Sequence, residues 1–247
     1  MIIVKSAPDL EGMRASGYIA ARVRDAIAGN VQAGVTTGEL ADYAEEMIKG
    51  FGAESAFLGY KGYPSSICVS VNEVVVHGIP GKRRIEVGDI VSIDVGVRYG
   101  GYVGDTAKTV MVGTCDPRVA ELVKTTEKCL MEAIALAREG RRLFDISHAI
   151  QGTAEAAGFS VVRQFVGHGI GRDMHEDPQI PNFGKPGTGP RLVAGMTFAI
   201  EPMVNMGRSE VEVLDDGWTV VTKDRKFSAH FEHTVAVGKD GAEVLTL

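Results

Sequence analysis

The chain has 247 residues, of which 45% are apolar, and it carries a formal net charge of −6. A chain of this length can bury a substantial core as one large domain. The acidic balance and the absence of any block of Lys or Arg argue against nucleic-acid binding, which normally needs a basic stripe.

The cysteines and the apolar runs indicate where the protein works. Cys68, Cys115 and Cys129 are widely spaced and odd in number, which favours a reducing compartment. The first residues turn polar too soon for a secretion signal. No apolar run approaches the roughly 20 residues that span a bilayer. We therefore expect a cytoplasmic protein with no membrane association and no nucleic-acid requirement.

Two helices are predicted at the start of the chain. Residues 8–29 carry apolar side chains at helical spacing. The next helix begins at Thr36, where Glu39 completes a capping-box pattern, and it closes near Gly50. From residue 67 to residue 112 the pattern changes to short β-branched runs, which predict strands: ICVSV, EVVVHG, DIVSIDVGV and TVMV.

Helices and then strands follow again. A third helix is predicted from the Asp116-Pro117 cap to a stop at Gly140, and a shorter one from Asp145 to about Ala157. Strands are predicted in FSVVRQFVGHG, GMTFAIEPMV, GWTVVTKD and HTVAVG, and residues 184–190 form a surface loop.

This order resembles a repeat. A shift of 106 residues produces a weak match that chance could also give, aligning Gly34 with Gly140, Leu40 with Ile146, and Gly52 with Gly158. No Pro/Ser-rich linker separates the halves. We interpret the chain as an α+β protein with a single domain over residues 1–247, built from two packed αβ halves, about 1–112 and 113–247.

Two aspartates flank a predicted hairpin. A two-residue loop at Tyr99-Gly100 places Asp94 directly opposite Asp105 on one face. Opposed like charges in a buried setting are costly unless a cation lies between them. A different turn register would instead leave two unrelated aspartates at a solvated edge.

Three further segments carry chemistry-bearing side chains. His168 and His175 lie seven residues apart among glycines, a spacing that indicates a loop or strand rather than a helical zinc motif. Glu201 follows an apolar strand in TFAIEPM, and Glu232 shares a predicted strand face with His230 and Thr234. Each residue alone could be an ordinary core group.

Together these residues predict a metal centre, with the ligands Asp94, Asp105, His168, Glu201 and Glu232. Four carboxylates balance two divalent ions, and this donor set suits Co, Mn, Fe, Zn or Ni better than a thiolate-selected metal. A metal pair can acidify water and stabilise a tetrahedral intermediate. His77 and His175 remain as acid/base or oxyanion-stabilising candidates.

Five ordered segments resemble the signatures of type I methionine aminopeptidases, which are M24 metallopeptidases: VVVHGIP, IDVGVRYGGYVGDTAKT, GHGIGRDMHE, TFAIEPM and FEHTVAV. The resemblance covers almost the whole chain. It implies the pseudo-symmetric pita-bread fold, two αβ halves around a central antiparallel sheet, and metal-dependent removal of the initiator methionine from nascent proteins and peptides.

The resemblance also implies residue roles. Asp94 would hold one metal, His168 and Glu201 the other, and Asp105 and Glu232 would bridge them. Metal-activated water would be the nucleophile, and Glu201 would shuttle the proton. The free α-amino group of the substrate would bind on the Asp94 side.

Further roles concern the substrate. His77 and His175 would contact it, while Tyr60, Tyr63, Cys68 and Trp218 would form the methionine pocket. A small second residue would be preferred. The partners would be N-terminal Met peptides and nascent polypeptides, acted on by a monomer, with ribosome association left open.

Three positions depart from the family pattern: Met174 stands where Phe is common, Val76 where Cys is common, and His230 where Gln is common. None of them removes a ligand. The short interval between His175 and Glu201 lacks the insertion of type II enzymes.

Two rival interpretations stay open. Prolidases and Xaa-Pro aminopeptidases share the fold and ligand types, but they normally carry an additional amino-terminal domain. A catalytically inactive pita-bread binding protein would be expected to lose ligands, and this chain keeps all five candidates.

Overall fold

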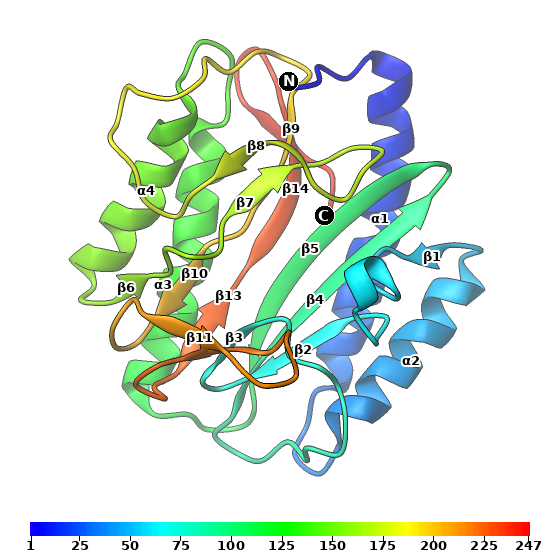
Figure 1. Ribbon diagram of the computed structural model, residues 1–247, viewed down its shortest axis with the longest axis vertical. Coiled ribbons are helices and arrows are strands. Elements are labelled where there is room, and N and C mark those ends of the chain that lie inside the picture. The colour runs from blue at the N-terminus through cyan, green and yellow to red at the C-terminus, as the bar shows by residue number, and fades with distance from the viewer.

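Four α-helices and fifteen strands make up the computed structural model, which describes residues 1–247 (Figure 1). The helices are α1 (Ala7–Asn30), α2 (Thr37–Gly50), α3 (Pro117–Leu136) and α4 (Leu143–Ala156), with a short 3-10 helix η1 (Tyr60–Gly62). No helix has the length and the apolar character needed to cross a membrane.

The strands fall into three antiparallel sheets. The large sheet has nine strands: β1 (Glu54–Ser55), β2 (Cys68–Val71), β4 (Ile90–Tyr99), β5 (Tyr102–Met111), β7 (Gly167–Gly169), β8 (Glu176–Ile180), β9 (Thr197–Ile200), β14 (Glu232–Val237) and β15 (Ala242–Val244). One small sheet contains β6 (Ser160–Val161), β10 (Met203–Asn205) and β13 (Ser228–His230). The other contains β3 (Val74–Val76), β11 (Val211–Val213) and β12 (Val220–Thr222).

The order of strands in the large sheet is β1-β4-β5-β14-β9-β7-β8, with β2 beside β4 and β15 beside β14. Strands from the two ends of the chain therefore meet at the centre, where β5 pairs with β14. The first half of the chain lies on one side of this seam and most of the second half on the other (Figure 1).

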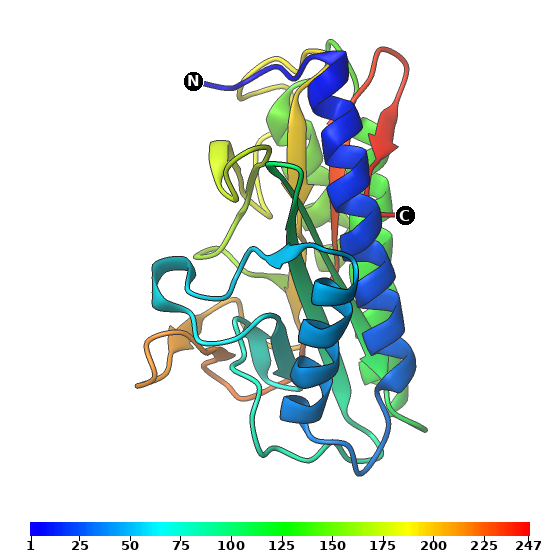
Figure 2. The same ribbon diagram turned by 90° about the vertical axis from the view of Figure 1, so that its right-hand side faces the viewer.

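The helices cover one face of the sheet and leave the other face for the site. Helix α1 lies on one side of the β4–β5 hairpin, while η1 and the β11–β12 hairpin project from the opposite side (Figure 2). Two large apolar clusters lie beneath the helices: one joins α1 and α2 to β2 and β4, and the other joins α3 and α4 to β9 and β14.

The two halves repeat the same helical arrangement. Helices α2 and α4 each have 14 residues, and their first residues, Thr37 and Leu143, lie 106 positions apart. A glycine with positive φ precedes each of them, Gly34 (φ 96°) and Gly140 (φ 84°). The weak sequence match therefore corresponds to equivalent helices.

The helix predictions are confirmed, with two corrected ends. Helix α3 stops at Leu136 rather than at Gly140. The backbone beyond it forms hydrogen bonds with distant segments instead: the Glu139 amide donates to Gly238 O and the Gly140 amide donates to Leu192 O. Helix α4 begins at Leu143, and Asp145 accepts the Arg142 amide from inside the first turn.

The predicted hairpin register is wrong by two residues. The loop is Gly100-Gly101, so Asp94 pairs with Ala107, and Asp105 pairs with Gly96. Both loop residues have positive φ, 58° and 83°, which glycine adopts without strain and Tyr99 would not. A shift of two keeps every side chain on its face, so Asp94 and Asp105 are diagonal neighbours on one face rather than directly opposed.

Three predicted strand segments are divided in the structure. FSVVRQFVGHG contains both β6 and β7, which belong to different sheets. The chain leaves β9 at Glu201-Pro202 before β10 begins, and Phe231 separates β13 from β14. His230 therefore belongs to a small sheet and Glu232 to the large one, which corrects the predicted shared strand.

Candidate metal centre

Five successive strands of the large sheet each bring one predicted ligand to the same cavity. In the sheet order β4, β5, β14, β9 and β7, these residues are Asp94, Asp105, Glu232, Glu201 and His168. Glu201 follows directly after the last residue of β9. Neighbouring strands lie about 4.8 Å apart, so five residues at a similar height can surround a small group of ions.

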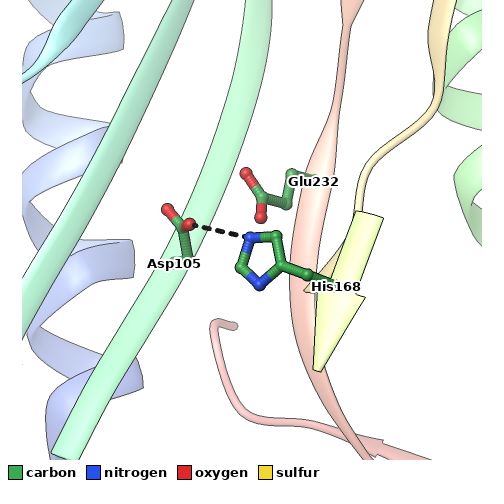
Figure 3. Close-up of side chains that lie close together, drawn as sticks. All are labelled: Asp105, His168 and Glu232. Carbon is green, nitrogen blue, oxygen red and sulfur yellow. Dashed lines mark ion pairs between the residues drawn. The ribbon is translucent and has the colours of Figure 1, made fainter. Parts of the chain in front are cut away.

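Three of these side chains converge closely. Donor atoms of Asp105, His168 and Glu232 all lie within 4.8 Å of one another (Figure 3). His168 Nε2 is 3.9 Å from Asp105 Oδ2 and 3.6 Å from Glu201 Oε1. Asp94 lies outside the close trio but lines the same cavity.

Three of the four carboxylates have an oxygen without a hydrogen-bond partner in the protein. Asp94 Oδ1, Asp105 Oδ1 and Glu232 Oε1 are buried and accept no hydrogen bond. No Lys or Arg forms an ion pair with any of the four acids. Buried unpaired carboxylates are costly, so this arrangement requires protons or cations.

The raised pKa values of the four acids also indicate that the site needs protons or cations. Desolvation raises the pKa of Asp94 to about 7. Desolvation, reinforced by the neighbouring acids, also raises the pKa values of Asp105, Glu201 and Glu232 well above their usual range. Four carboxylates therefore ionise together only if positive charge enters the cavity.

The imidazole of His168 is oriented as a donor to a cation. Its Nδ1 lies 2.9 Å from Gly169 O, a carbonyl that can only accept, so Nδ1 carries the proton. The lone pair is left on Nε2, the atom that faces Asp105 and Glu201. Burial lowers the pKa of His168 to about 3, which keeps the ring neutral. This donor set fits divalent metal ions.

Threonine hydroxyls fix the two central acids to each other. Thr234 Oγ1 accepts the Asp105 amide at 3.0 Å and donates to Asp105 O at 2.8 Å. Thr106 Oγ1 donates to Glu232 O at 2.8 Å. These bonds cross the β5–β14 seam and set the relative positions of Asp105 and Glu232.

An apolar pocket adjoins the carboxylates. The rings of Tyr63 and Trp218 meet edge to face at 5.1 Å, and Tyr63 donates to Gly78 O at 3.0 Å. Cys68 is buried and pairs with Asp94 across β2 and β4, which places the pocket beside the Asp94 end of the acid row. Tyr60 and Met174 line the same cavity.

Two histidines stand over this cavity. The ring of His77 meets that of Trp218 edge to face, with 6.1 Å between the ring centroids, and the His77 backbone has a positive φ of 58°. The ring of His175 stacks on that of Tyr60, and its Nδ1 shares a 2.9 Å hydrogen bond with the Tyr60 hydroxyl. The ring centroids of His175 and His168 lie 4.2 Å apart. Burial lowers the pKa of His77 to about 4 and also lowers that of His175. Both rings can therefore donate a hydrogen bond while neutral.

The structure adds two cavity residues that the sequence did not indicate, Phe57 and Lys61. Neither lies in a motif, and only the flanking Gly59 and Gly62 mark the turn that carries Lys61. Of the three departures, Met174 lines the cavity, while Val76 is buried without lining it. His230 Nε2 is buried, has no hydrogen-bond partner, and lies 3.9 Å from Glu201 Oε2.

A buried group of acids and one imidazole on this fold is a metallopeptidase arrangement, and the chain belongs to metallopeptidase family M24, which matches residues 11–239. The chain is 53% identical to methionine aminopeptidase A of Synechocystis over 247 residues, which cover 100% of this chain and 98% of that protein. Methionine aminopeptidase 1 of Bacillus subtilis is 50% identical, with 100% and 99% of the two chains covered.

Solved structures agree with this placement. A methionine aminopeptidase from Rickettsia prowazekii superposes with a TM-score of 0.98 at 45% identity and covers 100% of both chains. A prolidase from Pyrococcus furiosus has a TM-score of 0.81 at 24% identity, and the match covers 99% of this chain but 65% of the prolidase. The prolidase shares the fold alone. The expected pita-bread fold and a metal-dependent hydrolase are thereby confirmed.

Proposed function

We propose that this metallopeptidase hydrolyses the first peptide bond of peptides that begin with methionine, using two divalent metal ions. The observation that carries the proposal is the row of five ligands on five successive strands, placed beside an apolar aromatic pocket. Full-length relatives named methionine aminopeptidases support the methionine specificity.

The sheet order supports one assignment of the ligands. Asp105 and Glu232 lie on the adjacent strands β5 and β14, between Asp94 on one side and Glu201 and His168 on the other, and would bridge both ions. Asp94 flanks them on one side and would hold one ion, while Glu201 and His168 flank them on the other and would hold the second. Two divalent ions balance the four carboxylates, which removes the cost of their burial.

The ions, when bound, supply acidified water and polarise the scissile carbonyl. Glu201 is the acid farthest from Asp94 in the sheet order, is half-buried, and has Oε1 3.6 Å from His168 Nε2. It would move the proton from the nucleophile to the leaving amine. His77 and His175, both neutral, donate hydrogen bonds to the substrate and to the oxyanion that develops.

The pocket selects the first residue. Tyr60, Tyr63, Cys68 and Trp218 offer an apolar, polarizable surface that suits a thioether side chain. Because Cys68 pairs with Asp94, a methionine in this pocket has its α-amino group at the Asp94 end of the row. A free amino terminus at that end makes the enzyme an exopeptidase. A small second residue is preferred.

The site also bears on domain organisation and setting. Asp94 and Asp105 come from the first half and His168, Glu201 and Glu232 from the second, which supports a single catalytic domain over residues 1–247. Since every ligand comes from one chain, a monomer suffices. The three free cysteines are consistent with the cytoplasm, where nascent polypeptides would be the substrates.

Metal removal and replacement test the activity. A chelated sample should not cleave Met-Ala-Ser, and titration with a single divalent metal should restore turnover while bound metal is counted. An Ala-Pro peptide should not be cleaved. Cleavage of Ala-Pro in preference to Met-Ala-Ser would instead support a prolidase-type activity.

Isosteric variants of the central acids test the assignment. We expect Asp105→Asn and Glu232→Gln to lose bound metal and to lower kcat/KM by at least about 100-fold, since each removes one charge and one bridge. Asp42→Asn is the matched control, because Asp42 is exposed on α2. Full turnover in either central variant would refute the assignment.

A further inference from the structure

The rim of the catalytic cavity carries a single basic side chain. Lys61 is the only Lys or Arg among the residues that line the cavity. It is exposed, whereas Asp105, Glu232 and His168 at the bottom are buried. No carboxylate lies within ion-pair distance of its ammonium group, which sits 5.3 Å from the centre of the Tyr60 ring.

The local backbone holds Lys61 at this rim. Lys61 has a positive φ of 48° and lies between Gly59 (φ 78°) and Gly62 (φ 90°), in the turn η1 that projects from the site face (Figure 2). The preceding residue, Tyr60, is tied to His175 by stacking and by a 2.9 Å hydrogen bond. The position of Lys61 is therefore coupled to a residue that faces the substrate.

Lys61 would dominate the charge of the cavity once metal ions are bound. The four carboxylates at the bottom are neutralised when two divalent ions are bound. Among the lining residues outside the proposed ligands, Lys61 then carries the only permanent charge, on its ammonium group. A site of this kind attracts a substrate with negative charge near its rim.

The direction of the bound peptide places its downstream part near that charge. The first residue lies in the buried pocket beside Asp94 and Cys68. A peptide that extends from this pocket toward solvent would pass the half-buried His77 and then the exposed His175 and Lys61. Residues after the scissile bond, rather than the methionine, therefore meet the ammonium group.

We propose that Lys61 is a specificity-determining residue that favours peptides with a carboxylate downstream of the scissile bond. The carboxylate is either an acidic side chain at the third residue or the free carboxyl terminus of a tripeptide. This inference rests on the proposed function, because it assigns the pocket to the first residue and the rim to those that follow.

Amidated tetrapeptides isolate the effect of the side chain. The set is Met-Ala-X-Ala-amide with X as Asp, Asn or Lys, and kcat/KM is measured for each peptide with the metal-loaded enzyme. We expect the Asp peptide to exceed the Asn peptide by about two- to fivefold, the range of a solvent-exposed ion pair, and the ratio to shrink at high salt. Met-Ala-Ser with a free or amidated carboxyl terminus tests the second source of charge.

Charge variants identify the residue responsible. Lys61→Met should bring the Asp/Asn ratio to about one, Lys61→Glu should favour X as Lys, and Lys61→Arg should keep the Asp preference. Lys124→Met changes the net charge equally on the exposed face of α3 and should leave the ratio unchanged.

The neutral Asn peptide separates this inference from the proposed function. Its cleavage by the unmodified enzyme reports methionine removal, and failure there would refute the proposed function itself. With that activity present, an Asp preference that survives Lys61→Met would overturn the role of Lys61. A loss that is equal for all three peptides would also overturn it, because Lys61 would then act only through His175, whose pKa it lowers.

Discussion

Hydrogen bonds from neighbouring groups hold the residues of the site in position. Gly169 O fixes the proton of His168 on Nδ1, and two threonine hydroxyls fix the backbones of Asp105 and Glu232. The Tyr60 hydroxyl holds the ring of His175 in place through a 2.9 Å hydrogen bond with Nδ1, in which either atom can be the donor. Because the hydroxyl and Nδ1 are paired, the other ring nitrogen of His175 is available to the substrate.

This pairing gives a prediction for a single atom. Tyr60→Phe removes the hydroxyl and keeps the ring that stacks on His175. We expect kcat/KM for a Met-Ala peptide to fall by about 5- to 10-fold, the value of one hydrogen bond, while bound metal is unchanged. Tyr43→Phe, on the exposed side of α2, is the control. Loss of metal in the Tyr60 variant would show that the hydroxyl supports the metal centre instead.

At the residue scale, the sequence predicted which residues line the site, but it did not predict how they are arranged. All five predicted ligands line one cavity, since buried acids beside apolar strand residues need a cation. The cavity residues Phe57 and Lys61 were missed, because a turn brings them there and no periodic pattern marks them. The order of the ligands across the sheet also depends on the β5–β14 pairing, which joins residues more than 120 positions apart.

At the element scale, local hydrogen bonds determine some boundaries of helices and strands, and contacts with distant segments determine others. The capping box at Thr36 and Glu39 predicted the start of α2, because these bonds are local. The end of α3 was missed, because amides beyond it donate to Gly238 and Leu192 from distant segments. The hairpin register could have been read from Gly100-Gly101, the pair that a tight loop with two positive φ values requires.

The close crossing of α1 over β5 depends on two glycines. A β-carbon added at Gly104 would lie 2.6 Å from the Cα and N atoms of Gly17. Backbone on both sides leaves little room for relaxation. This contact lies one residue from Asp105, so the packing of a helix supports the position of a ligand.

Gly104→Ala should therefore destabilise the protein. We expect a loss of about 1–3 kcal/mol from overpacking, which lowers the Tm by roughly 2–12 °C for a chain of this size. Gly29→Ala in α1 is the control, because its new β-carbon meets nothing within 4 Å. That variant should be neutral or slightly stabilising. Equal Tm values for the two variants would show that α1 can move away from β5.

At the scale of the whole molecule, the proposed metal centre would join the two halves. Each half supplies its own two helices and part of the large sheet, but neither supplies a complete set of ligands. The four buried acids repel one another across the β5–β14 seam when they are ionised. Bound cations reverse this effect, so they should stabilise the contact between the halves as well as the catalytic site.

The stabilisation by metal should therefore increase with pH. Burial raises the pKa of Asp94 to about 7 and those of Asp105, Glu201 and Glu232 well above their usual range, whereas all four ionise near pH 4 in the unfolded chain. Without metal, the folded chain binds more protons than the unfolded chain above about pH 4. The contribution of these acids to stability is thus fully present below that pH and is lost as pH rises through 7.

Divalent ions bind the ionised acids and restore this stability. The difference in Tm between metal-loaded and chelated protein should be small near about pH 5.5 and larger near about pH 8. Burial lowers the pKa values of His77 and His233 to about 4 and that of His230 to about 3, so these rings stay neutral across this pH range in the chelated protein. Asp105→Asn should flatten the rise, because it removes one of the titrating acids from the seam. A difference that stays constant or falls with pH would mean that the acids are not neutralised by the metals.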